Sequence, residues 1–81
     1  MGTDEMNMME ERNRLKYQRI GENIAEYRCL KGYTQVQLAE KIGISSNYLS
    51  QIERGKREKY SLRVLVMAAD ALDVPLGALC D

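Results

Sequence analysis

Gly43 is the residue that most constrains the fold, because it separates two short apolar patterns with helical spacing. Before it, Leu38 and Ile42 are four residues apart. After it, Leu49 and Ile52 are three residues apart, and both spacings place side chains on one face of a helix. Glycine readily adopts the positive φ at which helices commonly end. Two short helices joined by a tight glycine turn form a helix-turn-helix.

Polar residues at the starts of the two helices support this prediction. Thr34 and Gln37 have the Thr-x-x-Gln spacing of a capping box, in which each side chain bonds the other residue's backbone N–H. Ser45 is a suitable N-cap for the second helix, and Ala39 is small enough to allow a close helix crossing. We therefore expect helices at about 35–42 and 46–54.

Helical spacing continues on both sides of this unit. Upstream, a helix is expected over 17–30, with the inward stripe Ile20, Ile24 and Tyr27. Downstream, a helix is expected to begin after Ser61 and run to about Leu72. Its inward residues are Leu62, Leu65, Ala68 or Ala69, and Leu72. A short fifth helix is expected over 75–79, with Pro75 in its first turn.

The first sixteen residues are harder to interpret. They mix methionines with charged residues and contain good helix formers near their end. Two alternatives remain open, a disordered arm and an upstream extension of the first helix. An arm that packs on a partner chain is a functional alternative. We therefore divide the chain into an arm, 1–16, and one all-α domain, 17–81.

The chain resembles the Cro/repressor-type (Xre) helix-turn-helix family over about 17–79. The residues that carry the resemblance are Thr34-Gln35, Leu38-Ala39, Gly43-Ile44-Ser45, Leu49 and Ile52-Glu53-Arg54-Gly55, with both flanks in register. The resemblance implies a compact five-helix, lambda-repressor-like DNA-binding domain. It also implies an ion pair between Arg28 and Glu53 that joins the first and third helices.

Net charge does not by itself favour DNA, because the chain has 12 basic and 12 acidic residues. The charges are unevenly distributed, however. Between Tyr17 and Tyr60 there are eight Lys or Arg and five Glu, an excess of three positive charges. This excess is densest between Arg54 and Lys59. Local rather than net charge governs attraction to a DNA backbone, so DNA binding is compatible with this composition.

The expected recognition helix carries a polar outward face. Asn47 and Gln51 each offer a donor and an acceptor, the combination that grips adenine in the major groove. The other residues expected at the DNA on or beside this helix are Ser45, Ser46, Tyr48 and Ser50. Tyr48 is equally suited to packing and to a phosphate or thymine-methyl contact. For each of these residues the plainer alternative is an ordinary solvated side chain.

A second set of residues is expected to contact phosphates, which position a protein without reading sequence. Gln35 has the family's place for such a contact, and Thr34 could add to it. The remaining members are Arg54, Lys56, Arg57 and Lys59, with a solvated basic loop as the alternative. The family usually acts as two-fold dimers. The C-terminal segment has more apolar residues than one small helix needs on its inward side. These residues are the candidates for a dimer surface, and the alternative is that they simply cap the core: Val74, Leu76, Leu79 and Cys80.

The leading hypothesis is a small sequence-specific transcriptional regulator of a bacterium or phage, a repressor or autoregulator. The alternative is a protein-interaction module or antitoxin-like partner protein with the same fold. An enzyme is not expected, because the chain has no histidine, no phosphate-binding glycine loop and no paired nucleophile and base. Two widely spaced cysteines give no metal-binding pattern, so no metal or cofactor is expected. With no signal-peptide or membrane-spanning pattern, the expected location is the cytoplasm.

Overall fold

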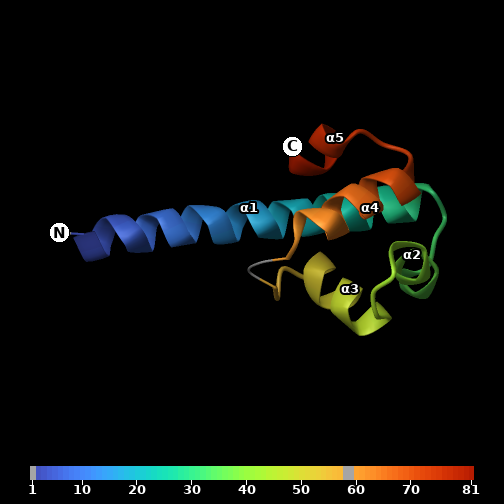
Figure 1. Cartoon of the computed structure of the whole chain (residues 1–81), viewed down its shortest axis with the longest axis horizontal. Helices are drawn as coiled ribbons and strands as arrows, with labels where there is room; N and C mark the ends of the chain where they lie inside the picture. The colour runs from blue at the N-terminus through green and yellow to red at the C-terminus, as the bar shows by residue number, and fades with distance from the viewer. Residues whose placement is uncertain (1, 58–59) are drawn as a thin grey trace.

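Five α-helices make up the fold, and the structure, a computed structural model, describes residues 2–57 and 60–81. In chain order the helices are α1 (Gly2–Leu30), α2 (Gln35–Ile42), α3 (Ser46–Glu53), α4 (Leu62–Leu72) and α5 (Leu76–Cys80) (Figure 1). The described residues contain no strand, so the predicted all-α, five-helix fold is confirmed. None of these helices combines the length and the apolar composition required to cross a bilayer.

Helix α1 is longer than the helix expected over 17–30, because it begins at Gly2. Its first half projects from the bundle with no other helix beside it, whereas its second half lies among α3, α4 and α5 (Figure 1). The described side chains Met8 and Leu15 on the projecting half are exposed. Residues 2–16 are therefore an upstream extension of the first helix, the second of the two alternatives for the arm.

The core lies where the second half of α1 meets the other four helices. Its largest fully buried side chains are Ile24, Leu38, Leu49, Ile52, Leu72 and Leu79. From α4, Leu65, Ala68 and Ala69 are buried as expected. Leu62 was expected to point inward, but it is 64% exposed and this prediction is wrong. It is the first residue of α4, and the inward face of that helix begins one turn later, at Leu65.

The polar caps of the helix-turn-helix form as the sequence predicts. The backbone N–H of Gln37 donates to Thr34 Oγ1 over 3.1 Å, and the N–H of Thr34 donates to Gln37 Oε1 over 2.9 Å. Gly43 ends α2 in the left-handed region, with φ 75°. Ser45 then caps α3 by accepting from the N–H of Tyr48 over 3.0 Å. Each end of the connection therefore satisfies backbone groups that a short helix would otherwise leave without partners.

The ends of the two C-terminal helices are set by unusual backbone positions. Helix α4 ends at Leu72, as expected, and its C-cap Asp73 adopts φ 57° without being glycine. Aspartate is among the few residue types that visit this region with some frequency. Pro75 has ψ 150°, which is extended, so it precedes α5 as its N-cap instead of lying in its first turn. Asn23 Nδ2 donates to the Leu79 carbonyl over 2.9 Å and ties α5 to α1.

Gly21 is a point of close approach between α1 and α3. It is buried, and a Cβ at this position would lie 2.9 Å from the carbonyl carbon of Ile52 and closer still to its oxygen. No real Cβ atom tolerates such a distance to backbone. The absence of a side chain at Gly21 therefore lets the two helix backbones touch and sets the depth of α3 against α1.

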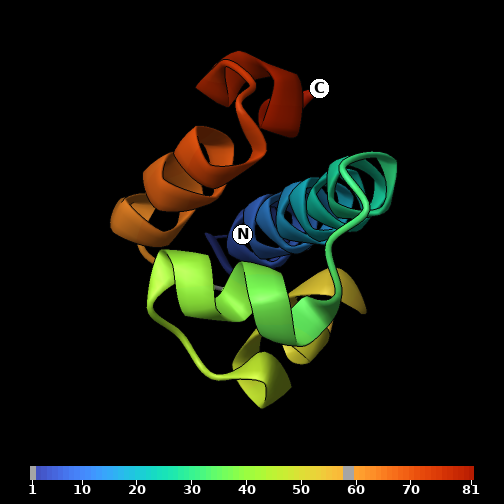
Figure 2. The same ribbon diagram turned by 90° about the vertical axis from the view of Figure 1, so that its right-hand side faces the viewer.

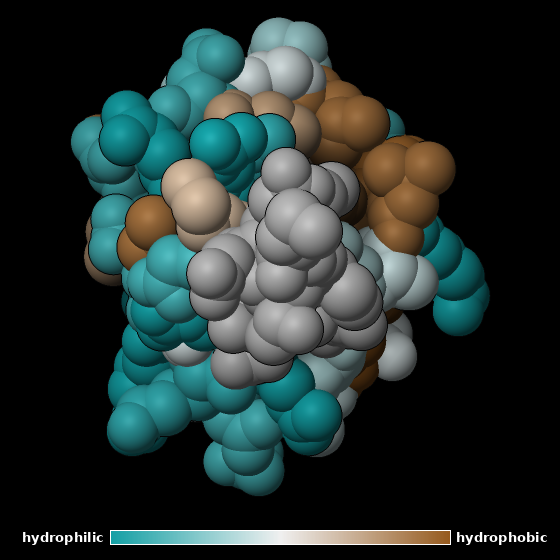
Figure 3. All heavy atoms as spheres, turned by 90° about the vertical axis from the view of Figure 1, so that its left-hand side faces the viewer, coloured by the Kyte–Doolittle hydropathy of each residue, from teal (hydrophilic) through white to brown (hydrophobic). Residues whose placement is uncertain are grey.

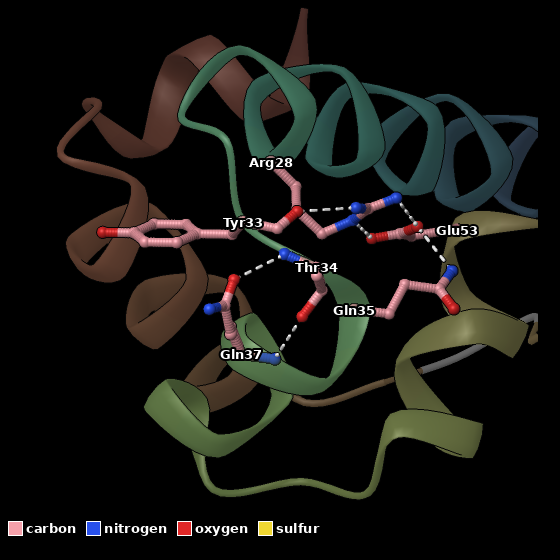
Figure 4. Close-up of polar contacts among 6 residues, drawn as sticks. All are labelled: Arg28, Tyr33, Thr34, Gln35, Gln37 and Glu53. Atoms are coloured by element: carbon pink, nitrogen blue, oxygen red, sulfur yellow. Dashed lines mark hydrogen bonds and ion pairs between the residues drawn. The ribbon is translucent and has the colours of Figure 1, made fainter.

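A buried carboxylate joins three helices beside this contact. Arg28 on α1 donates from Nε to Glu53 Oε2 over 2.8 Å and from Nη2 to Oε1 over 3.1 Å. Gln35 on α2 donates from Nε2 to Glu53 Oε1 over 2.9 Å (Figure 4). Arg28 also donates from Nη1 to the Tyr33 carbonyl over 2.8 Å. The ion pair implied by the family resemblance is thus present, and the hydrogen bond with Glu53 raises the pKa of Arg28.

Tyr60 anchors the chain between α3 and α4. Its hydroxyl donates to the Tyr17 carbonyl over 3.0 Å, and the two rings meet edge to face with centroids 4.9 Å apart. Burial raises the pKa of the Tyr60 phenol. This part-buried hydrogen bond holds the segment that follows α3 against the middle of α1.

We expect Gly21→Ala to destabilise the fold by more than about 3 kcal/mol. An extra methyl group in a packed core usually costs about 1–3 kcal/mol, and a clash with backbone atoms costs more. The matched control is Gly77→Ala in α5, where a Cβ would meet nothing within 4 Å. That substitution should be neutral or stabilising by up to about 1 kcal/mol, since alanine favours helix. Urea unfolding of both variants measures the difference, and equal stabilities would contradict the close α1–α3 contact.

We expect Glu53→Ala to cost about 3–5 kcal/mol, because it leaves the largely buried Arg28 guanidinium without its partner. Glu22→Ala, an exposed position on α1, is the control and should change stability by less than about 0.5 kcal/mol. Thermal unfolding of the two variants checks this. A Glu53→Ala variant as stable as the control would mean that the carboxylate does not hold the three helices together.

Candidate nucleic-acid interface

Helix α3 presents a polar face on the side of the molecule away from α4 and α5. Helices α2 and α3 lie below α1, α4 and α5 in both ribbon views (Figure 1, Figure 2). The inward side of α3 is Leu49 and Ile52, which have no exposed surface. Ser46 and Asn47 are exposed, while Ser50 and Gln51 are half-buried. The helix therefore has a fixed apolar face and a free polar one.

The surface around this helix is hydrophilic as well. Viewed from the N-terminal end of α1, the lower part of the molecule, on the α3 side, carries mostly hydrophilic residues (Figure 3). Apolar atoms gather at the upper right of this view. Leu62 and Val66, one turn apart on α4, are exposed. The polar face of α3 and the apolar stripe of α4 therefore lie on different sides of the domain.

The turn after α3 returns the chain to that helix. Gly55 has φ 72°, and the N–H of Lys56 donates to the Gln51 carbonyl over 2.8 Å. The N–H of Gly55 donates to the Ile52 carbonyl over 3.1 Å, which completes a Schellman ending. This geometry places Arg57 beside Gln51, although six residues separate them in the sequence.

Arg57, Gln51 and Tyr48 form a cluster that the sequence did not predict. Arg57 Nε donates to Gln51 Oε1 over 2.8 Å, and the Arg57 guanidinium lies 4.9 Å from the centre of the Tyr48 ring. Tyr48 is half-buried against the core, so its ring is a fixed surface against which the Arg57 guanidinium packs. The only sequence signal for this cluster was Gly55, which predicts a reversal of the chain at the end of α3.

The residues expected at phosphates are spread over two places. Thr34 and Gln35 lie at the start of α2, and Arg54, Lys56 and Arg57 follow α3, where all three are exposed. Lys59 lies outside the described residues. The Gln35 amide nitrogen is already bonded to Glu53, and the Thr34 hydroxyl to the N–H of Gln37. The first N–H groups of α2 remain as donors for an anion at this end, together with the Thr34 O–H and the second amide N–H of Gln35.

The expected dimer surface needs one correction. Leu79 is completely buried, because α5 folds back on α1 and inserts this side chain into the core, so Leu79 cannot be part of an exposed contact surface. Val74 and Leu76 are half-buried and pack against the same core, whereas Cys80 is exposed. At Leu79, therefore, core capping is the role that the structure supports.

Comparison with known proteins agrees with this geometry. The helix-turn-helix family model matches residues 24–79, which is most of the chain. The transcriptional regulator SinR of Bacillus subtilis (strain 168) is 42% identical over 62 residues, covering 76% of this chain and 56% of SinR. The chain spans about half the length of the curated relatives it matches first.

Two solved structures share the fold. The structure of SinR, the master regulator for biofilm formation, in complex with DNA superposes with a TM-score of 0.72 at 42% identity, covering 76% of this chain and 98% of that one. The restriction-modification controller protein C.AhdI of Aeromonas hydrophila superposes with a TM-score of 0.73 at 33% identity, covering 78% and 94%. The chain thus belongs to the Cro/C1-type helix-turn-helix family.

Proposed function

We propose that this chain binds double-stranded DNA sequence-specifically and acts as a small transcriptional regulator, a repressor or autoregulator in the cytoplasm. One observation carries the proposal: α3 is held rigidly by its apolar face and by Glu53, and it offers a polar face beside a cluster of cations. A major groove admits one helix, and its base edges offer donors and acceptors. An apolar outward face on α3 would have favoured a protein partner instead.

In this proposal the residues divide between two kinds of contact. Ser46, Asn47 and Gln51 approach base edges, with Ser45 and Ser50 beside them. The N-terminus of α2, with Thr34 and Gln35, approaches a phosphate through its backbone N–H groups. The exposed cations after α3 neutralise further phosphates, and these contacts set the register without reading sequence. The polar exposure of α3 and the exposure of Arg54 and Lys56 support this division.

We further propose that two copies act together. One small helix-turn-helix unit covers a single half-site, and a two-fold dimer spaces two such helices about 34 Å apart along the duplex. Because Leu79 is buried in the core, the residues that we propose for the contact between the two copies are Val74, Leu76 and Cys80. Footprinting on a bound duplex would reveal two protected half-sites at this spacing.

The first test is binding of the pure protein to the DNA upstream of its own gene and to scrambled DNA of the same composition. We expect preference for the upstream DNA, with affinity falling as salt rises from 50 to 200 mM. If four or five phosphates are neutralised per chain, the slope of log affinity against log salt should be about −4 per chain. Absence of binding to both DNAs would favour the alternative, a protein-interaction module.

We expect Lys56→Ala to weaken binding to all sequences alike and to reduce the salt slope by about one unit, because it removes one phosphate contact. Arg12→Ala is the control, since this exposed arginine lies on the projecting half of α1. Binding isotherms at four salt concentrations measure both slopes. An unchanged slope for Lys56→Ala, or an equal loss in the control, would remove Lys56 from the phosphate set.

A further inference from the structure

Arg57 is fixed to α3 by two contacts of different chemistry. Its Nε donates to Gln51 Oε1 over 2.8 Å, and its guanidinium stands 4.9 Å from the centre of the Tyr48 ring. Arg57 is exposed, and an exposed arginine with a single contact would sample many rotamers. A hydrogen bond and a cation–π contact together restrict it to the end of the polar face of α3.

The contact with Arg57 changes what Gln51 can offer to a base. A glutamine grips adenine with two groups, because its oxygen accepts from N6 while its nitrogen donates to N7. Here the Gln51 oxygen already accepts from Arg57 and lies against a positive charge. The oxygen keeps a second lone pair, but the adjacent guanidinium charge weakens it as an acceptor, so the stronger group that Gln51 offers to a base is the Nε2 amide, which only donates.

Arg57 adds further donors at the same place. A guanidinium carries five N–H groups, and the bond to Gln51 uses one of them. The Gln51 amide nitrogen and the Nη edge of Arg57 together therefore offer mainly donors to a base. The guanine edge in the major groove offers two acceptors, N7 and O6, whereas adenine places its N6 donor where this pair would need an acceptor.

We propose that Gln51 and Arg57 act as one composite reader of guanine, with Tyr48 as the residue that positions Arg57. The proposal rests on the DNA-binding function proposed above and specifies the base class that the end of α3 selects. It replaces the expectation that Gln51 alone reads adenine. It also moves Arg57 from the phosphate set to the residues that read bases.

The test is selection of duplexes from a random library by wild-type protein, Arg57→Ala and Tyr48→Ala, with Lys56→Ala as the matched control. Wild type should enrich guanine at one position of each half-site. Arg57→Ala frees the Gln51 oxygen, so the guanine-over-adenine preference at that position alone should fall by about 5- to 150-fold. Tyr48→Ala should weaken the same preference, and Lys56→Ala should leave it unchanged.

The outcomes separate the two proposals. Enrichment by wild type of adenine at the position sensitive to Arg57, or a uniform loss across all sequences in Arg57→Ala, would overturn the composite reader and leave DNA binding intact. No enrichment by wild type would overturn both. Arg57 is exposed, so its variant should unfold at the wild-type temperature, and this measurement excludes misfolding as the cause of a changed preference.

Discussion

The carboxylate of Glu53 is the interaction on which the position of α3 depends. It belongs to the last residue of α3 and receives hydrogen bonds from Arg28 on α1 and Gln35 on α2. A helix of eight residues has little stability of its own, so its orientation must come from tertiary contacts. A buried ion pair contributes modestly to net stability, but breaking it is costly, which makes it effective at excluding other orientations.

Packing around this carboxylate separates structural from functional surface. Gly21 brings the backbones of α1 and α3 into contact, and Leu49 and Ile52 are fully buried beneath α3. These contacts use one face of the helix and leave Ser46, Asn47 and Gln51 facing outward. The polar face is thus displayed on a rigid support, which is the requirement for reading bases at hydrogen-bond distance.

Local features of the fold could be predicted from the sequence, and contacts between distant segments could not. The capping box at Thr34, the positive φ of Gly43 and the cap at Ser45 each depend on a few neighbouring residues. Gly21 was different, because its role comes from Ile52, thirty-one residues away, and no spacing rule predicts that approach. Arg28 and Glu53 could be paired only through the resemblance to a known family.

The errors have physical causes of the same kind. Leu79 was a candidate for the dimer surface, with core capping as the alternative, because a short amphipathic helix does not reveal which of its leucines faces inward. Leu62 follows its N-cap directly, and helical spacing alone does not determine where the buried stripe begins. The Arg57–Gln51 bond crosses a Schellman turn, so its existence depends on the path of the chain after Gly55.

The most direct test of DNA binding through α3 is a ¹⁵N chemical-shift titration of the full chain with a duplex carrying the DNA that it prefers. If α3 enters the major groove, the largest shifts fall at Ser46, Asn47 and Gln51, with smaller ones at the N-terminus of α2 and after Gly55. Shifts that concentrate instead on the exposed stripe of Leu62 and Val66 on α4 would contradict it, because DNA would then contact a different side of the domain.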